Sequence, residues 1–245
     1  MTNVSTCADA KTGQSVDELS IRIARSPAEL RKAFRLVFER YYRAGLETPK
    51  ASRIRLTPYH LLPTSEVLIA ERNSVITSTL SMFGDSPAGL PMESMYGQQI
   101  CHLRSQGFRL AEIGSLADRR NGQGRFINTF VQIGRLLAQV AQSRGIDVIV
   151  AAVHPRHARL YEKVMGFRQI GHYSSCPYAN GNPAVALCLK FDDHLGTPLH
   201  DQYFGTPLPE EELLPYQWET NTREFFAEIL ERESNLSEVT SDCNY

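Results

Sequence analysis

The 245-residue chain lacks several features that would place it in a specialised class of proteins. No apolar stretch reaches the roughly 18 residues that a membrane-spanning helix needs. The N-terminus, MTNVSTCADAKTGQSVDE, has no apolar core, so we expect no signal peptide there. The formal net charge is only −1, and a chain so close to neutrality is not expected to bind nucleic acid over its whole surface.

Cysteine is scarce and scattered. The five cysteines form no CxxC pair: Cys7, Cys101, Cys176, Cys188 and Cys243. Their odd number and wide spacing argue against a disulfide framework and against a zinc site. His154 and His157 stand close together, but no third ligand accompanies them, so we predict no metal site. We expect a protein of the reducing cytoplasm.

What is present is an ordinary globular composition with an uneven distribution of charge. Apolar residues make up 42% of the chain and charged residues 22%. Residues 119–168 contain nine Lys and Arg and two Asp and Glu, whereas residues 191–245 contain two Lys and Arg and thirteen Asp and Glu. A basic middle suits an anionic ligand or an acidic partner, and an acidic tail is typical of a solvated face or a disordered end.

Hydrophobic periodicity predicts one mixed domain. Strands are expected at 19–24, 66–71, 75–83, 108–117, 146–153, 167–173 and 184–190. Helices are expected at 27–43, 92–106, 125–144, 155–165 and 222–232. The domain is predicted to span 19–190, between a disordered N-terminus at 1–18 and an acidic extension at 191–245. Residues 46–65 hold three prolines and no periodicity, which is typical of a long binding loop.

A glycine-containing turn follows the strand at 108–117. The pattern Arg119-x-x-Gly122-x-Gly124 opens the next helix, so the backbone can wrap closely around an anion and the free amides of the helix start can point at it. The candidates to bind phosphate are Arg119, Arg120, Asn121, Gly122, Gln123, Gly124 and Arg125. The alternative is a glycine-rich surface turn. The pattern is neither a dinucleotide fingerprint nor a Walker loop.

A second segment, LYEKVMGF at 160–167, follows one helix and one strand later. Together the two segments resemble the GNAT superfamily of acyltransferases over about residues 19–190, although LYEKVMGF carries one residue more than the usual form. The resemblance implies an α/β (α+β) fold with a mixed sheet of about seven strands, flanked by helices and splayed at its centre. An acyl thioester binds at the splay as a co-substrate, an amine attacks it, and no tightly bound cofactor is implied.

The resemblance also implies two catalytic residues. Tyr161 stands where the superfamily often keeps a tyrosine that protonates the leaving thiolate, and phenol and thiol pKa values are close. Glu112 stands where a carboxylate often deprotonates the amine, directly or through water. The alternatives are that Tyr161 only packs its helix and that Glu112 is a structural carboxylate. The amides near Leu116 and Ala117 are candidates to hold the thioester carbonyl.

Gly114 interrupts the same strand, and a glycine inside a strand often marks a bulge. In a regular pleat Ser115 would point away from the face of Glu112. A bulge would bring both side chains to one face, so Ser115 is a candidate to contact substrate.

Three segments point to a subgroup within the superfamily. AFRLVFERYYRAGLETP at 33–49, the run from Arg109 to Ala117 with Glu112 and Leu116, and VHPRHARLYEKVMGFRQIG at 153–171 resemble N-acyl amino acid synthases and autoinducer synthases. That group joins a long fatty acyl chain, carried on acyl carrier protein, to the amine of an amino acid, tyrosine among them. The resemblance implies acyl carrier protein as partner, and the complete RxxGxG turn leaves acyl-CoA open as donor.

Several apolar residues are candidates to line an acyl tunnel: Phe34, Phe38, Met82 and Met95, with Leu80 and Met92 beside them. The alternative is ordinary core packing. Two further functions also stay open. One is an acetyl-CoA-dependent N-acetyltransferase of a small amine, and the other is a non-catalytic module that binds an acyl donor as a sensor.

Overall fold

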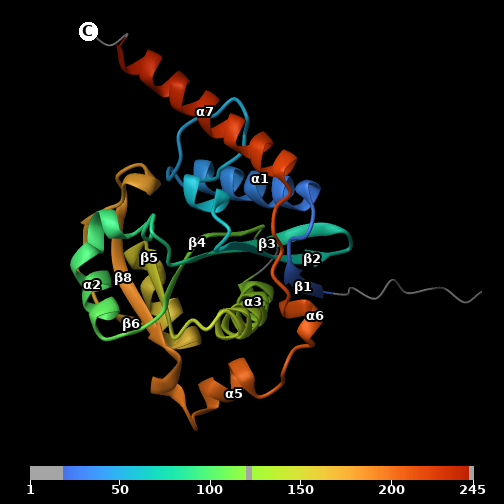
Figure 1. The fold of residues 1–245 in the computed structure, drawn as a ribbon, viewed down its shortest axis with the longest axis vertical. Helices are drawn as coiled ribbons and strands as arrows, with labels where there is room; N and C mark the ends of the chain where they lie inside the picture. Colours follow the sequence, from blue (N-terminus) through green and yellow to red (C-terminus); the bar gives the residue numbers. More distant parts are fainter. Residues whose placement is uncertain (1–18, 120–122, 243–245) are drawn as a thin grey trace, which may run out of the picture.

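One mixed sheet forms the centre of the protein (Figure 1). The computed structural model describes residues 19–119 and 123–242, so the disorder predicted at 1–18 lies outside the described residues. The strand order is β1-β2-β3-β4-β5-β8-β6, and β7 pairs with β8. The strands are β1 (Leu19–Ile23), β2 (Ser65–Arg72), β3 (Val75–Gly84), β4 (Leu110–Asp118), β5 (Val148–Val153), β6 (Arg168–Gln169), β7 (Ser174–Ser175) and β8 (Pro183–Lys190). The predicted mixed α/β fold is confirmed.

Among the strands, the one expected at 167–173 differs most from the prediction, and it raises the count from about seven to eight. It is split into β6 and β7, of two residues each. The Tyr96 hydroxyl lies within hydrogen-bonding distance of both His172 O and Ala184 O, so it bridges the segment between the two short strands and β8. A Cβ on Gly171 would lie 2.9 Å from the Tyr96 ring, so only glycine permits this approach.

Helices cover both faces of the sheet. They are α1 (Pro27–Arg43), α2 (Glu93–Ser105), α3 (Gln123–Ser143), α4 (Pro155–Leu160), α5 (Pro198–Phe204), α6 (Glu210–Leu213) and α7 (Thr220–Asp242). Short helical turns lie at η1 (Pro58–Leu61), η2 (Tyr161–Met165), η3 (Pro177–Ala179) and η4 (Phe191–His194). The start of α1 is as predicted, because Ser26 caps it by accepting the Glu29 N–H and Pro27 occupies its first turn.

The two faces have separate cores. On the α3 face, Leu137 and its helix neighbours pack on Ala111 of β4 and Ile149 of β5. On the opposite face, α1 packs Phe34 over β2 and β3, while α2 packs Ile100 over β5 and β8. We call these the α3 face and the α1–α2 face. In Figure 1, α1 lies above the β2–β3–β4 part of the sheet and α3 below it.

The segment after 190 packs on both faces. On the α3 side Tyr203 of α5 is buried, and its hydroxyl donates to Met165 O at 2.7 Å. On the other side Phe226 of α7 is fully buried and meets the Phe34 ring at 5.3 Å between centroids. The helix predicted at 222–232 is therefore part of the longer α7, whereas α5 and α6 were not predicted.

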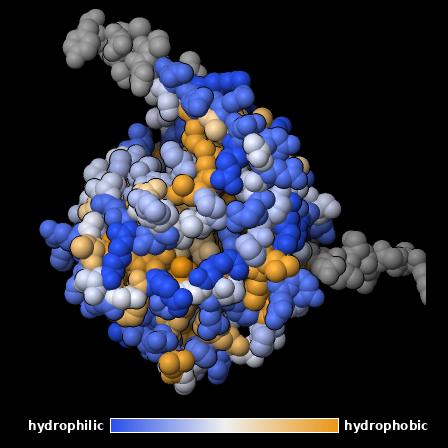
Figure 2. Space-filling model, viewed as in Figure 1, coloured by the Kyte–Doolittle hydropathy of each residue, from blue (hydrophilic) through white to orange (hydrophobic). Residues whose placement is uncertain are grey.

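The surface is mixed in character. Figure 2 shows apolar groups where α7 crosses α1, and further apolar patches lie among hydrophilic groups lower on the same face. Among the described helices, none is long and apolar enough to cross a membrane.

Candidate active site

The sheet opens at its centre between β4 and β5. These parallel strands pair only from Leu110 with Val148 to Ile113 with Ala151. Beyond that point β4 continues to Asp118 against β3 alone, and β5 continues against β8 alone. This is the splay that the GNAT resemblance implied, and it exposes backbone amides of β4 to a ligand.

The bulge expected at Gly114 is present one residue further on. Leu80 of β3 opposes both Ser115 and Leu116, and Ser115 has a positive φ of 52°. Leu116 packs on the α3 face, whereas Ser115 contacts Arg55 on the α1–α2 face. The bulge therefore brings Ser115 to the same face as Glu112.

Glu112 is buried on β4 beneath the start of α2. Glu112 is only 5% exposed, and its Oε2 accepts the Met92 N–H at 2.7 Å. Burial raises the pKa of Glu112 to about 8, the Met92 hydrogen bond opposes the rise, and the Glu93 charge adds to it. A carboxyl with a pKa near neutrality is suited to exchange a proton with an amine.

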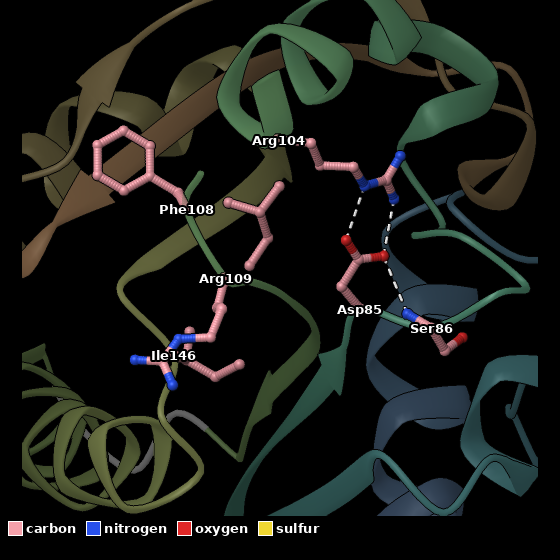
Figure 3. A pocket seen from close by; sticks show the side chains of 7 residues that line it. Asp85, Ser86, Arg104, Phe108, Arg109 and Ile146 are labelled. Atoms are coloured by element: carbon pink, nitrogen blue, oxygen red, sulfur yellow. Dashed lines mark hydrogen bonds and ion pairs between the residues drawn. The ribbon is translucent and has the colours of Figure 1, made fainter. Parts of the chain in front are cut away.

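An ion-pair network braces the turn that supplies the Met92 N–H. Arg104 of α2 binds both oxygens of Asp85, at 2.7 Å each, and also pairs with Glu93. Figure 3 shows Arg104 and Asp85 in a hollow of about 460 Å³, which Phe108, Arg109 and Ile146 also line. The hollow lies where β4 begins, at the opposite end from the splay. The ion pairs of Arg104 with Asp85 and Glu93 hold the start of α2 over Glu112.

Arg55 lies on the other side of Ser115, in the loop between α1 and β2. The residue is 6% exposed, its guanidinium lies 4.2 Å over the Tyr41 ring, and Nε is 3.1 Å from Glu47. Nη2 donates to Tyr178 O, and Nη1 is 3.5 Å from Ser115 Oγ. A cation is thus held at the bulge by groups from three segments of the chain.

Three more titratable side chains surround Glu112 and Arg55. Burial lowers the pKa of His60 to about 3, helped by the Arg55 charge, so His60 is neutral. Burial also raises the pKa of Tyr59 to about 12, with the Tyr178 phenol and the Glu112 charge adding to it. Burial raises the pKa of the Cys176 thiol, which Arg55 lowers and Glu112 raises further. Cys176 is therefore within electrostatic reach of both.

None of these surrounding residues was singled out in the sequence. The loop at 46–65 was predicted to bind a ligand, and it contains Arg55, Tyr59 and His60. No periodicity separated them from the rest of that loop. Cys176 and Tyr178 lie in a short turn before β8 that carried no motif at all.

Tyr161 lies on the α3 face, in η2. It is 5% exposed and packs edge to face with Phe130 and Phe167, at centroid distances of 5.3 and 5.5 Å. Burial raises the pKa of Tyr161, and the Tyr41 phenol adds to the rise from the α1 side. Tyr161 is therefore fully protonated at neutral pH, as a proton donor must be.

The predicted phosphate turn is only partly described. Arg119 donates from Nε to Ile76 O at 2.9 Å, and Ala117 is buried opposite Thr79. Arg120, Asn121 and Gly122 lie outside the described residues, and Gln123, Gly124 and Arg125 are described only as the backbone that begins α3. The start of α3 does follow the splayed end of β4, as the turn requires.

The four tunnel candidates are not brought together. Phe34 packs among His60, Trp218 and Phe226, and Phe38 stacks on Tyr42. Met95 packs against the α2 cluster, whereas Met82 is buried on the α3 face. A single tunnel lined by all four is therefore not present, because the sheet separates Met82 from the others.

The two histidines of the basic segment have a local role. His154 caps α4 by accepting the Arg156 N–H at 3.2 Å, and its ring centroid is 6.2 Å from that of His157. Within residues 19–119 and 123–242, no group of three or more His, Cys, Asp or Glu is arranged to hold a metal ion.

Comparison with known proteins points to one family. The model of the family described as N-acyl amino acid synthase FeeM matches residues 32–190. The chain is similar in structure to FeeM, an N-acyl amino acid synthase from uncultured soil microbes. The two share 24% identity over 76% of this chain and 98% of that chain, with a TM-score of 0.63.

Two further structures share the fold. The AHL synthase LasI is 14% identical over 79% of this chain and 98% of its own, with a TM-score of 0.58. A polyamine N-acetyltransferase from Drosophila melanogaster is 11% identical over 71% of this chain and 100% of its own, with a TM-score of 0.50. A search of curated proteins found no match. Because the family match covers well over half of the sequence, this chain belongs to the FeeM family of N-acyl amino acid synthases and is an acyltransferase.

Proposed function

We propose that this enzyme transfers a long-chain fatty acyl group from a phosphopantetheine thioester to the amine of an amino acid. The observation that carries the proposal is Glu112, a buried carboxyl beside the splay with its pKa raised to about 8. Membership of the FeeM family supports an amino acid as acceptor. The donor is acyl carrier protein or acyl-CoA.

The proposed reaction needs one base and one acid. The acceptor ammonium first loses one proton to solvent, and the neutral amine attacks the thioester carbonyl. Glu112 takes the second proton from the attacking nitrogen as the C–N bond forms. The C–S bond breaks, Tyr161 protonates the departing thiolate, and both side chains then exchange protons with solvent to return to their starting states. The backbone amides at the bulge, near Leu116, would stabilise the oxyanion that forms in between.

The charge distribution supports an anionic acyl donor. The phosphopantetheine arm would enter at the splay, near the start of α3 and near α4. Arg156 and Arg159 of α4 belong to the basic region at 119–168. An acidic carrier protein would be steered to such a surface, and CoA phosphates would be attracted to it as well.

A donor panel tests the proposal. Purified protein is offered acetyl-CoA, palmitoyl-CoA or palmitoyl carrier protein together with a mixture of amino acids, and products are identified by mass spectrometry. We expect N-palmitoyl amino acids, with the preferred donor given by the relative kcat/KM. Products that are acetylated only would overturn the proposal in favour of an acetyltransferase.

A sensor gives a different result in the same assay. It would bind palmitoyl carrier protein without turnover, and Glu112→Gln would change nothing. For an enzyme we expect Glu112→Gln to keep donor affinity, measured by titration calorimetry, while turnover falls.

A further inference from the structure

A buried arginine stands beside the proposed base without a part in the proposed reaction. Arg55 is one of the few charged residues buried within the described part of the chain, and its guanidinium reaches the β4 bulge. Burying a cation costs free energy unless partners compensate for it. We therefore infer that Arg55 is buried for a function and not only to fold its loop.

The described partners of Arg55 leave much of its hydrogen-bonding capacity unused. A guanidinium has five N–H donors. Nη2 donates to Tyr178 O, and the contact from Nη1 to Ser115 Oγ is long, at 3.5 Å. Glu47 balances the charge from 3.1 Å away at Nε, without the geometry of a hydrogen bond. The long contact with Ser115 leaves Nη1 able to donate to another acceptor beside that residue.

The arrangement matches the two ends of an α-amino acid. Glu112 and Ser115 share one face of β4, and Arg55 contacts Ser115. The Tyr59 ring packs on Phe83, the β3 partner of Glu112, and on Tyr178, whose carbonyl accepts from Arg55, so one aromatic cluster borders both groups. In an α-amino acid the amine and the carboxylate are attached to the same carbon. An amine held at Glu112 would therefore place its carboxylate towards Ser115 and Arg55.

The edge of this cluster meets solvent at Tyr178. Tyr178, whose carbonyl accepts from Arg55, is 37% exposed. Its ring meets Tyr59 edge to face at 6.4 Å between centroids. The turn before β8 is therefore a solvent-facing edge of the cluster, and we expect an acceptor to enter from this side.

We propose that Arg55, assisted by the Ser115 hydroxyl, binds the carboxylate of the acceptor and restricts the enzyme to amines that carry a neighbouring carboxylate. Guanidinium groups bind carboxylates through paired N–H donors, which a lysine ammonium does not reproduce. The inference rests on the proposed function, since it names the substrate group that one part of that site recognises.

The first test changes the substrate and leaves the protein intact. Wild-type enzyme with its preferred acyl donor is given tyrosine, tyrosine methyl ester or tyramine, and the steady-state constants are measured. Loss of one partner from a desolvated charge pair typically weakens binding about 100-fold. We expect kcat/KM to fall by about that factor for the ester and for tyramine, mainly through KM.

The second test changes the arginine. Arg55→Gln should lower kcat/KM for tyrosine about 100-fold, again through KM, and should change kcat/KM for tyramine by less than about threefold. Arg55→Lys should keep part of the wild-type kcat/KM, because a lysine keeps the positive charge but lacks the paired N–H donors of the guanidinium. Arg53→Gln, at an exposed position of the same loop, is the matched control and should behave as wild type.

The outcomes separate the inference from the proposed function. If no amino acid is acylated by the wild type, the proposed function fails. If amino acids are acylated but the wild type accepts tyramine as readily as tyrosine, only the role of Arg55 is overturned. Equal losses for tyrosine and tyramine in Arg55→Gln would likewise assign Arg55 to loop structure. Should Arg55→Gln fail to fold, the comparison of substrates on wild-type enzyme still decides.

Discussion

Two buried glutamates on opposite faces of the same sheet differ in what surrounds them. Glu66 of β2 lies on the α3 face, where Arg144 Nε is 2.7 Å from its Oε1. Glu112 of β4 lies on the α1–α2 face and accepts an N–H from Met92. Among the residues that the structure describes, no cation pairs with Glu112. Burial raises the pKa of both carboxyls, and the Arg144 charge opposes the rise only at Glu66.

The difference separates a structural role from a chemical one. Arg144 also donates to Leu213 O, so its pair with Glu66 ties the end of α3 to β2 and to α6. Such a carboxylate holds elements together. A buried carboxyl without a cation costs folding free energy and gains a pKa suited to proton transfer. The α3 face thus offsets part of the cost of burying its carboxyl with Arg144, whereas the α1–α2 face leaves that cost without a cation.

The largest expected effect is on turnover. Glu112→Gln removes the base and keeps the shape of the side chain, so we expect kcat/KM to fall about 1,000-fold in the N-acylation assay. The circular dichroism spectrum should be unchanged. A variant that retained wild-type turnover would make Glu112 structural, like Glu66.

A smaller loss is expected for the proposed acid on the other face. Tyr161→Phe removes one hydroxyl and should lower kcat about 100-fold, because the thiolate then leaves without a positioned proton. Tyr203→Phe is the matched control. Tyr203 is also a buried phenol on the α3 face, but its hydroxyl donates to Met165 O. Tyr203→Phe should reduce thermal stability and keep kcat, and equal kinetic losses in the two variants would leave Tyr161 without a catalytic role.

The same substitution at Glu66 tests the structural role of that carboxylate. Glu66→Gln removes the charge that Arg144 pairs with, and chemical denaturation should show a loss of about 2 kcal/mol. The figure is modest because Arg144 keeps partial contact with solvent. Turnover by the folded variant should match the wild type, and a selective loss of turnover would contradict the separation of roles.

A separate effect, independent of catalysis, is expected on the pH dependence of folding. The folded state holds the Glu112 proton more tightly than the unfolded chain, where the carboxyl pKa is about 4.5. Its contribution to stability is complete below pH 4.5 and falls as pH rises to about 8. The slope is about 1.4 kcal/mol per pH unit. Urea denaturation of wild type and Glu112→Gln from pH 5 to 8 measures this slope. Parallel plots of unfolding free energy against pH for the two proteins would show that Glu112 ionises normally.

Much of the fold could be predicted because its strands and helices have clear periods. The helix predicted at 27–43 has those bounds, and the strand predicted at 184–190 differs by one residue. The prediction failed for the strand at 167–173, where Tyr96 intrudes from a distant part of the chain. It also missed α5, whose Tyr203 is held by contacts with Met165 and Gln139 rather than by local pattern.

The candidate site was predictable only in part. The family resemblance pointed to Glu112 and Tyr161, and their catalytic roles stay predictions until they are tested. The bulge that turns Ser115 was signalled by Gly114 beside it. Arg55 carried no signal, because nothing near it in sequence indicates that it is buried.

Local order along this chain therefore follows from residues that are near one another in sequence. The cap at Ser26, the strand periods and the bulge beside Gly114 depend on backbone preferences that act over a few residues. Arg55 meets Ser115 across 60 positions, and only the packing of the loop against α1, β4 and the turn before β8 brings them together. The raised pKa of Glu112 likewise arises from burial, and burial exists only once distant segments have excluded water.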